Sequence, residues 1–443
     1  MISQQLLALQ KSREHDFEIL SDSIWETPET RYKEFKSSSA QKVFLRKEGF
    51  RLVEPIGGIE TAFMAEKGSG KPVIAICGEF DALPGLSQKA DDTEKHPITE
   101  NSPGHGCGHN LLGTASLEAA VLAADLASCG TIRYFGCPAE EGGAGKAFMV
   151  RSGCFEGCDI ALSWHPNSLS CLFNNSLANA RIIYEFFGIS SHAAASPQLG
   201  RSALDAAELM NVGCNFLREH IISEARLHYA FLDAGGPENI VQPYCKLIYA
   251  IRAPLITQVG EIMDRVNDVA RGAALMTSTK VKISIASAYA NLMHNDTLDD
   301  LMLENAKQLF PLQYTDEETE YARGFAKPGT VEPIETGLIT AKKIPPAAST
   351  DFGDVSWIVP SSCMAINCYA KGTAMHSWQA TSQGKSSIAH KGMHSAAAII
   401  AGTALDVMSK PEIVGKARKD LETVLAGEKY RSLIPADVKP GSF

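Results

Sequence analysis

Thiol, imidazole and carboxylate side chains recur in four short segments, and residues of these types can together hold divalent metal ions. The first segment is Gly106-Cys107-Gly108-His109-Asn110. Gly108 lets the backbone bend tightly, so that the Cys107 thiol and the His109 imidazole can converge on one cation. A single Cys-x-His pair in a glycine-rich loop is usually incidental, but two flanking glycines and an expected downstream helix favour a ligand pair.

An acidic pair, Glu140-Glu141, forms the second segment and directly follows an apolar strand expected at residues 132–135. Adjacent carboxylates are usually a solvated surface turn. Here they lie just beyond the carboxyl end of a buried strand, where open α/β folds place ligand sites. A metal-dependent hydrolase needs one carboxylate as a ligand and another that takes a proton from water, and neighbouring side chains can divide these duties.

Histidines supply the remaining two segments. His165 follows an apolar stretch directly, and His376 lies a few residues after another. His390 and His394 are alternatives to His376 as the metal ligand. They lie on the expected closing helix, residues 387–408, where histidines more often have no role as ligands. One cysteine, three histidines and one glutamate, mostly at strand ends along one edge of a sheet, predict a two-metal site.

A further polar group lies in the middle of the chain. His192 follows an expected strand, Asn239 precedes another, and Arg252 lies at the end of that second strand. By composition alone these are surface residues without function. If this part of the chain folds over the catalytic cleft, their side chains suit an oxyanion and a substrate carboxylate.

Alternating apolar strands and helices predict how these residues are positioned. The first forty residues read as amphipathic helix broken at Thr27-Pro28. Further on, buried strands alternate with helices, which predicts a mostly parallel sheet covered on both faces. These strands are expected at residues 73–77, 132–135, 160–164 and 363–369, and the helices at 111–126, 144–151 and 387–408.

Between residues 178 and 289 the pattern changes to strand, helix, two strands, helix and strand, which is the order of a ferredoxin-like α+β domain. The simplest organisation is a catalytic domain formed by residues 1–177 and 290–443, with an inserted domain at 178–289. The inserted elements are expected at residues 181–188, 202–220, 225–232, 246–252, 258–276 and 280–285.

Composition excludes several classes of function. The 443 residues carry a net charge of -10, which argues against nucleic-acid partners and against anionic membranes. No apolar stretch reaches the ~18 residues of a membrane span, and no signal peptide opens the chain. Eleven cysteines, an odd number spread along the chain, suit reduced thiols in the cytoplasm. A thiol-redox role for Cys154 and Cys158 is disfavoured because their spacing is not Cys-x-x-Cys.

As a set, these motifs resemble the aminoacylase and carboxypeptidase G family of metallohydrolases, and within it the amidohydrolase subfamily that includes the auxin-conjugate hydrolases. The resemblance spans nearly the whole chain, in order, and its C-terminal motifs resemble bacterial hydrolases of p-aminobenzoyl-glutamate. The segments that carry it are residues 78–85 (GEFDALPG), 106–110 (GCGHN), 138–143 (PAEEGG), 190–194 (SSHAA), 200–204 (GRSAL), 376–384 (HSWQATSQG) and 388–393 (IAHKGM).

The resemblance implies a division of labour around two divalent metal ions. Cys107 would bridge the ions as a thiolate, with His109 and His165 completing one site and Glu141 and His376 completing the other. Glu140 would be the general base that deprotonates the attacking water and then passes the proton to the departing amine.

The same resemblance implies that the inserted domain is a dimerisation lid, so that the protein would be a homodimer. His192 would reach into the partner subunit's site to stabilise the oxyanion. Asn239 and Arg252 would hold the α-carboxylate of the substrate.

The sequence departs from the wider family at one position. Many members have His-x-Asp at the end of the early strand, with the histidine as a ligand, whereas this chain has Glu79-Phe80-Asp81. We expect His109 to supply the missing nitrogen and Asp81 to act as an orienting carboxylate. One thiolate and three imidazoles suit zinc, and the carboxylate and water ligands are equally compatible with manganese.

Together these observations predict a metal-dependent amidohydrolase. Its expected substrate is a small N-acyl or N-aroyl amino acid, with aspartate or glutamate as the amino acid, such as indole-3-acetyl-aspartate or p-aminobenzoyl-glutamate. A dipeptidase or carboxypeptidase of the same family is the main alternative, since its fold and site would be the same. A catalytically silent protein that has kept the scaffold and binds metal is a further alternative.

Overall fold

The computed structural model describes residues 2–342 and 348–442, and these residues form two compact units. Unit 1 comprises residues 2–175, 292–342 and 354–430. Unit 2 comprises residues 176–291 together with two later stretches, residues 348–353 and 431–442. The four segments with candidate metal ligands belong to unit 1.

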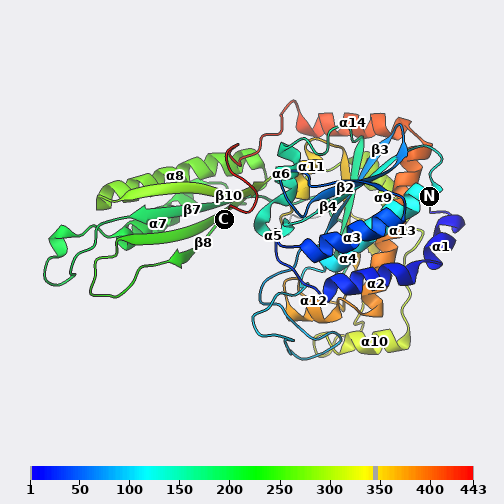
Figure 1. Cartoon of the computed structure of the whole chain (residues 1–443), viewed down its shortest axis with the longest axis horizontal. Coiled ribbons are helices and arrows are strands. Elements are labelled where there is room, and N and C mark those ends of the chain that lie inside the picture. The colour runs from blue at the N-terminus through cyan, green and yellow to red at the C-terminus, as the bar shows by residue number, and fades with distance from the viewer. Residues whose placement is uncertain (1, 343–347, 443) are drawn as a thin grey trace. The chain divides into compact units, whose positions relative to one another are not determined.

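A largely parallel sheet forms the centre of unit 1 (Figure 1). Its described strands run in the order β1-β2-β4-β3-β5-β12-β6-β11. The central strands β4, β3, β5 and β12 are parallel, whereas β2 pairs antiparallel with β4. The bounds are β1 (Arg51–Val53), β2 (Phe63–Ser69), β3 (Val73–Glu79), β4 (Gly130–Cys137), β5 (Ile160–Asn167), β6 (Ser170–Leu172), β11 (Leu338–Ile339) and β12 (Ser361–Asn367).

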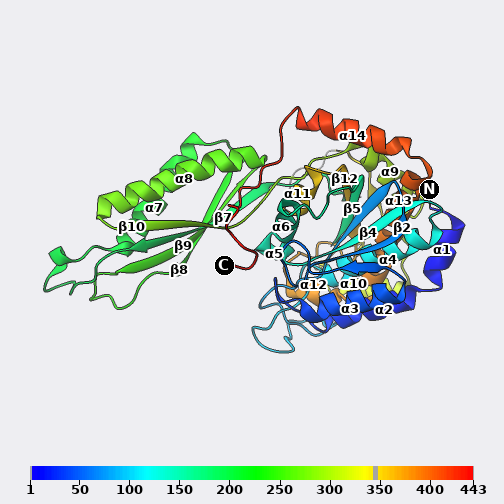
Figure 2. The same ribbon diagram turned by 45° about the horizontal axis from the view of Figure 1, so that its top comes forward.

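Helices cover both faces of this sheet (Figure 2). Buried side chains of α2, α3, α9, α13 and α14 share one hydrophobic cluster with α4 and one face of the sheet, whereas α6 lies on the other face, where Lys146 meets Glu79. Helix α4 packs on β3, and α13 packs along α4. The helices that lie wholly or largely in unit 1 are α1 (Gln4–Lys11), α2 (Glu14–Trp25), α3 (Phe35–Lys47), α4 (His109–Leu126), α5 (Glu140–Gly143), α6 (Gly145–Arg151), α9 (Asp296–Ala306), α10 (Asp316–Arg323), α11 (Phe352–Ser356), α12 (Trp378–Gln383), α13 (Ser387–Ser409) and α14 (Glu412–Leu425).

The N-terminal helical region differs from its sequence-based expectation. Helix α2 ends at Trp25, close to the expected break at Thr27-Pro28. A second break, between Lys11 and Glu14, separates α1 from α2. Arg13 leaves helical geometry there, and its guanidinium donates two hydrogen bonds to the Glu48 carboxylate at 2.9 and 2.6 Å. This contact joins residues far apart in the sequence, so local periodicity could not predict it.

Unit 2 is an α+β fold with the strand–helix–strand–strand–helix–strand order of a ferredoxin-like domain. Its described strands form an antiparallel sheet in the order β10-β7-β9-β8. Helices α7 and α8 pack against each other and on this sheet. The elements are β7 (Ala178–Phe187), α7 (Ala203–Leu217), β8 (Arg226–Asp233), β9 (Tyr244–Ala253), α8 (Ile256–Thr277) and β10 (Lys280–Tyr289), with short 3-10 turns at Pro197–Leu199 and Arg218–His220.

The predicted fold class, a mostly parallel α/β sheet with a separate ferredoxin-like α+β part, is therefore confirmed. Among the described helices, none combines the length and apolar character needed to cross a bilayer.

Close approach of α4 to β3 depends on a glycine. A Cβ atom at Gly113 would lie 2.4 Å from the backbone oxygen of Glu79 and 2.7 Å from Gln41 Nε2. We therefore expect Gly113→Ala to destabilise unit 1 by about 1–3 kcal/mol, the usual cost of overpacking. Midpoints of urea unfolding would measure this change.

Gly415 offers the matched control, because it lies on the exposed side of α14 and a Cβ atom there would meet nothing within 4 Å. Gly415→Ala should be neutral or stabilising, by up to about 1 kcal/mol, because alanine favours the helix. Equal stability of the two variants would contradict the close-packing argument.

Candidate metal centre

The predicted ligands converge where the central strands of unit 1 end. His165 lies near the end of β5, the Glu140-Glu141 pair follows β4, and His109 is the first residue of α4. Gly108 takes the left-handed conformation (φ 68°) immediately before the helix, which turns Cys107 and His109 toward the same space. A Cβ atom at Gly108 would lie 2.1 Å from Tyr369 Oη, so this turn has no room for a side chain.

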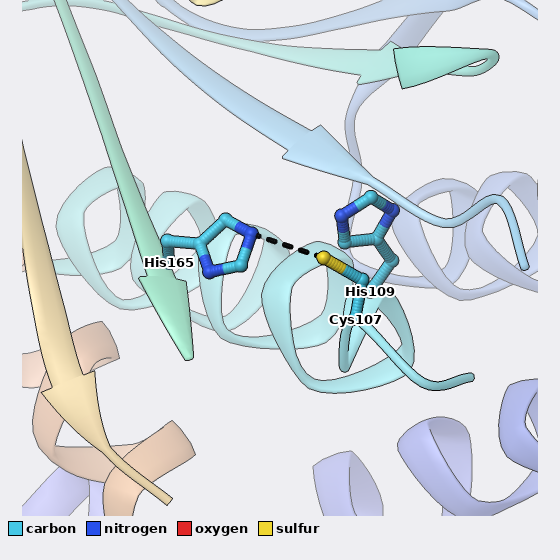
Figure 3. A group of neighbouring side chains, drawn as sticks. All are labelled: Cys107, His109 and His165. Atoms are coloured by element: carbon cyan, nitrogen blue, oxygen red, sulfur yellow. Dashed lines mark hydrogen bonds between the residues drawn. The ribbon is translucent and has the colours of Figure 1, made fainter. Parts of the chain in front are cut away.

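Cys107, His109 and His165 form the first candidate ligand group (Figure 3). Their ligand atoms lie within 4.8 Å of one another, and Cys107 Sγ is 3.5 Å from His165 Nε2. His165 Nδ1 donates to the Pro166 carbonyl oxygen at 2.7 Å. Its proton is thereby fixed on Nδ1, and the lone pair of Nε2 is directed at the thiol.

The second candidate group contains Cys107 again, with Glu141 and His376. His376 Nε2 lies 3.2 Å from Glu141 Oε1. The backbone N–H of His376 donates to the Gly106 oxygen at 2.8 Å, which ties this distant segment to the loop that carries Cys107. Among the described residues, Cys107 is thus shared by two groups of three potential ligands.

Unusual backbone geometry accompanies the second group. His376 has a φ of 60°, and Ala139 and Ala144, which flank the acidic pair, have φ values of 61° and 60°. Non-glycine residues pay a conformational cost in this region, and such strain concentrates at functional sites. The strain here aims His376 and the acidic pair at the same point.

Asp81 connects the two ligand groups. Its Oδ1 atom is 3.0 Å from His109 Nδ1, and its Oδ2 atom accepts the backbone N–H of Glu141 at 2.9 Å. The first contact leaves His109 Nε2 as the nitrogen available to a ligand, and the second fixes the start of the acidic turn. Asp81 therefore has the geometry of an orienting carboxylate.

Several buried polar atoms at this site fit a cation. In the described chain His109 Nε2, Glu79 Oε2 and Glu141 Oε1 are buried and make no hydrogen bond of good geometry; the first two lie 3.3 Å apart, and Glu141 Oε1 lies 3.2 Å from His376 Nε2. Burial and the nearby Asp81 carboxylate raise the pKa of Glu34 to about 8, which reflects the crowding of acidic groups. Thiol, imidazole and carboxylate donors around unsatisfied buried atoms match the requirements of a divalent metal ion.

The protonation states depend on the same crowding. Burial and the Glu141 carboxylate raise the pKa of the Cys107 thiol well above its ordinary value. Burial opposes the charged form of Glu141, yet hydrogen bonding to His376 and the charge of His109 lower the pKa of Glu141 to about 2. Burial and the His109 charge lower the pKa of His165, which favours a neutral imidazole. A thiolate at Cys107 consequently requires a cation beside it.

Sequence comparison places the chain among known proteins. No protein-family model matches it. It is 41% identical over 456 residues to one of the p-aminobenzoyl-glutamate hydrolase subunits of Escherichia coli, covering 95% of each chain. The chain belongs to the aminoacylase and carboxypeptidase G family.

One further relative and one solved structure extend the comparison. The chain is 31% identical over 430 residues to an Xaa-Arg dipeptidase of Mus musculus, covering 93% of this chain and 90% of the relative. Its fold resembles that of a dinuclear metal-binding peptidase of the M20 family from Bacillus subtilis, with a TM-score of 0.61 and 17% identity over 90% of this chain and 99% of the other. The family resemblance inferred from the motifs is confirmed.

Two residues to which sequence analysis assigned no role, Glu79 and Lys146, lie buried beside the candidate metal centre. A ligand atom of Glu79 lies within 4.8 Å of ligand atoms of His109 and Glu140. The Oε1 atom of Glu79 is 2.7 Å from Lys146 Nζ, and both side chains are almost fully buried. A lysine directly before the apolar residues of α6 is the signal that could have indicated this pair.

Three other histidines and cysteines have different environments. His390 Nε2 lies 3.0 Å from Asp22 Oδ1 and belongs to none of the candidate ligand groups found among the described residues. His105 contacts the Ile24 oxygen at 3.2 Å, and burial with the His109 charge lowers the pKa of His105 to about 3. Burial raises the pKa of Cys154 to about 11, which opposes thiol-redox chemistry.

The remaining predicted residues lie in unit 2. His192 is exposed, and its Nδ1 atom accepts the backbone N–H groups of Ala194 and Ala195, both at 3.2 Å. The backbone oxygen of Asn239 accepts the N–H of Ala193 at 2.9 Å, so the segments that carry His192 and Asn239 are adjacent. Arg252, near the end of β9, donates to Ser349 Oγ at 3.0 Å.

The Glu79–Lys146 ion pair generates a stability prediction. Lys146→Met removes the cation and leaves a buried carboxylate uncompensated, so we expect a loss of about 3–5 kcal/mol. Urea unfolding would measure it. Lys307→Met is the matched control, because Lys307 pairs with Glu304 on the surface and its loss should cost at most about 1 kcal/mol.

The double variant Lys146→Met/Glu79→Gln provides a second check, since removing both charges should recover part of the lost stability. A Lys146→Met variant that unfolds at the same urea concentration as Lys307→Met would contradict the role assigned to this pair.

Proposed function

We propose that the protein is a metal-dependent amidohydrolase that cleaves the amide bond of an N-acyl or N-aroyl amino acid, with glutamate or aspartate as the amino acid. The observation that carries the proposal is the pair of ligand groups sharing Cys107, with the Glu140 carboxylate beside them. The catalysed reaction adds one water across the amide and releases a carboxylic acid and an amine.

The ligands proposed for one ion are Cys107, His109 and His165, and those for the other are Cys107, Glu141 and His376. When bound, divalent metal ions supply Lewis acidity, which lowers the pKa of water and polarises an amide carbonyl. Zinc suits the thiolate and imidazole donors, whereas manganese suits the carboxylate and water ligands. We propose one of these two metals.

Glu140 is the proposed general base. One of its oxygens lies within 4.8 Å of ligand atoms of His109 and Glu79, and it directly precedes the proposed ligand Glu141. This position lets its carboxylate take a proton from the attacking water and then transfer that proton to the leaving amine nitrogen.

His192 is the proposed oxyanion donor. Because backbone N–H groups can only donate, the two that contact Nδ1 fix this atom as an acceptor. The neutral ring therefore carries its proton on Nε2, where it is available to a developing negative charge on the substrate oxygen. The exposure of His192 is consistent with action on a substrate rather than a structural role.

Arg252 and Asn239 are proposed to hold the substrate's α-carboxylate. Arg252 Nε is buried and lacks a hydrogen-bond partner in the described chain, although Nη1 of the same guanidinium donates to Ser349. A guanidinium with an unsatisfied N–H is well suited to a carboxylate. This recognition supports substrates that end in a free amino acid.

The names of the relatives favour different amino acids. The 41% identical relative belongs to a p-aminobenzoyl-glutamate hydrolase, and the 31% identical relative is an Xaa-Arg dipeptidase. Both substrates contain an amide bond next to an amino acid with a free carboxylate. We rank p-aminobenzoyl-glutamate first because the higher identity extends over 95% of each chain. Dipeptide hydrolysis is the second candidate.

A substrate panel tests this ranking. The protein is stripped with a chelator, reloaded with Mn²⁺ or Zn²⁺, and assayed with p-aminobenzoyl-glutamate, indole-3-acetyl-aspartate, N-acetyl amino acids and Xaa-Arg dipeptides. We expect chelation to abolish activity and the aroyl-glutamate to have the highest kcat/KM. Faster turnover of dipeptides, with none of the aroyl conjugates, would favour the second candidate.

Within the same assay, Glu140→Gln should lower kcat by roughly 10²–10⁴-fold while bound metal is retained, because only the proton transfer is removed. Glu156→Gln is the control, with the same change of charge at an exposed residue. Full activity of Glu140→Gln would refute the assigned base, and loss of metal would reassign Glu140 as a ligand.

We further propose that unit 2 mediates assembly. Strand β8 lies at the edge of its sheet, and it exposes Tyr229, Phe231 and Leu232 by 43%, 39% and 53%. Exposed apolar side chains on an edge strand are typical of a surface that pairs with another chain. A homodimer is one such assembly. Two of the relatives, 41% and 26% identical, are named as different subunits of p-aminobenzoyl-glutamate hydrolase, which supports a second possibility, a complex with a different chain.

Light scattering of the purified chain distinguishes these assemblies. We expect a dimer whose formation is weakened by Phe231→Glu, since a charge would be buried against the partner chain. The control Phe35→Glu places the same charge on an exposed phenylalanine of α3 in unit 1. A monomer that is active only after a second chain is added would favour the mixed complex.

A further inference from the structure

The sheet of unit 2 has one face that its helices α7 and α8 do not cover. Both helices lie on one side of this sheet (Figure 2). Tyr184 of β7 donates a hydrogen bond to Asn267 of α8, and Tyr249 of β9 donates one to Asn211 of α7. Successive side chains of a strand point to opposite faces. Odd-numbered residues of β7 and even-numbered residues of β9 therefore lie on the other side, which we call the helix-free face.

Three arginines lie close together on the helix-free face. Arg252 of β9 is directly opposite Arg226 of β8. Arg181 of β7 is opposite Ala250, which places it diagonally from Arg252. Directly opposed side chains have Cβ atoms roughly 5 Å apart, and diagonal neighbours have Cβ atoms roughly 7–8 Å apart. The long arginine side chains can therefore bring three guanidinium groups to one ligand.

Within the described part of the chain, no carboxylate forms an ion pair with these arginines. Arg226 donates to the backbone oxygens of Ser223 and Ala225 at 2.6 and 2.8 Å. Arg252 donates to Ser349 Oγ at 3.0 Å. Like charges directly opposite each other on a sheet are destabilising. An anionic ligand would relieve the repulsion between Arg226 and Arg252.

Unsatisfied polar groups lie beside the same arginines. Arg181 is partly buried, and its guanidinium makes no hydrogen bond among the described residues. Asn179 is fully buried directly opposite Arg252, and its Nδ2 atom donates to Tyr289 Oη at 2.8 Å. Asn179 Oδ1 and Arg252 Nε are buried and make no hydrogen bond of good geometry within the described chain. Because buried polar groups are nearly always hydrogen-bonded, these atoms point to a polar ligand.

Acidic residues on the neighbouring segments have other partners. Glu185, at the far end of β7, pairs with Lys282 at 3.2 Å. Glu224, two positions before Arg226, is exposed, and its carboxylate accepts the Ser223 hydroxyl at 2.8 Å. Neither carboxylate forms an ion pair with the three arginines, so the positive charge at this end of the face is available to a ligand.

His228 responds to the same concentration of positive charge. It lies on the helix-free face of β8, opposite Ala250. Burial and the nearby Arg252, Arg218 and Arg226 guanidiniums lower the pKa of His228. The ring is therefore neutral near neutral pH, and it adds an N–H donor to the group rather than a further charge.

We infer that Arg252, Arg181 and Arg226 bind the two carboxylates of one acidic amino acid, with the α-carboxylate on Arg252 and the side-chain carboxylate on the other two arginines. This inference rests on the proposed function, in which Arg252 holds the amino-acid part of the substrate. Guanidinium groups suit carboxylates because their paired N–H donors match the two oxygens. The cluster would select glutamate or aspartate and would repel the cationic side chain of an Xaa-Arg dipeptide.

Two conjugates that differ by a single charge test the inference. p-Aminobenzoyl-glutamate and p-aminobenzoyl-glutamine have nearly the same shape, but only the first carries a side-chain carboxylate. Their dissociation constants are measured by equilibrium dialysis with the full-length, metal-stripped chain, so that binding is separated from hydrolysis. We expect the glutamate conjugate to bind roughly 10–100-fold more tightly, the range for hydrogen bonds between charged groups.

Arg181→Gln and Arg226→Gln should each reduce this preference by about tenfold and change the affinity for the glutamine conjugate by less than about threefold. Arg181→Lys keeps the charge and should retain part of the preference. Arg271→Gln is the matched control, because Arg271 lies exposed on α8 and pairs with Asp268. It should keep the wild-type ratio. Circular dichroism checks that each variant is folded.

A wild-type ratio in both Arg181→Gln and Arg226→Gln would overturn the inference. Equal binding of the two conjugates to the wild type, or binding of neither, would do the same. Competition by inorganic phosphate as strong as that by free glutamate would indicate a general anion site, which also contradicts selection of an acidic amino acid. If the preference is observed but the metal-reloaded chain hydrolyses neither conjugate, only the proposed amide hydrolysis is rejected.

Discussion

The candidate metal centre depends on one carboxylate. Asp81 contacts the ring of His109 with one oxygen and the backbone N–H of Glu141 with the other. Each of these residues belongs to a different ligand group, so a single side chain at the end of β3 sets the geometry of both. Burial and the nearby Asp81 carboxylate raise the pKa of Glu34, and the same Glu34 accepts the backbone N–H of Ala139, next to the acidic pair. The Glu34 carboxyl therefore links the charges of this site to the backbone that positions the acidic pair.

The sequence predicts the positions of those ligands that lie at the ends of regular strands. Parallel strands end at one edge of a sheet, so residues such as His165 and Glu141 could be expected to converge from their positions in the sequence alone. The fold class followed from the same alternation of strand and helix. The approach of His376 is less regular, because its left-handed backbone and its bond to Gly106 come from a loop whose path no periodicity encodes.

Other features could not be predicted because they depend on pairs of residues distant in sequence. Lys146 looks like a surface residue until Glu79, from a different element, is found buried against it. The break before α2 depends in the same way on Arg13 meeting Glu48. For His390, sequence reasoning preferred a position on the closing helix, away from the other ligands, and the structure places it there, beside Asp22. The tertiary contacts of each histidine, rather than its residue type, decide whether it lies among the candidate metal ligands.

Arg252 illustrates a different consequence of the chain's path. Its guanidinium contacts Ser349, which belongs to a stretch of unit 2 that follows almost a hundred positions later in the chain. The coding sequence of unit 2 is therefore split into separate segments. Recombination that exchanged only residues 176–291 between relatives would separate this arginine from the serine that it contacts. A functional exchange of unit 2 between relatives should accordingly require all of its separate coding segments rather than the transfer of one cassette.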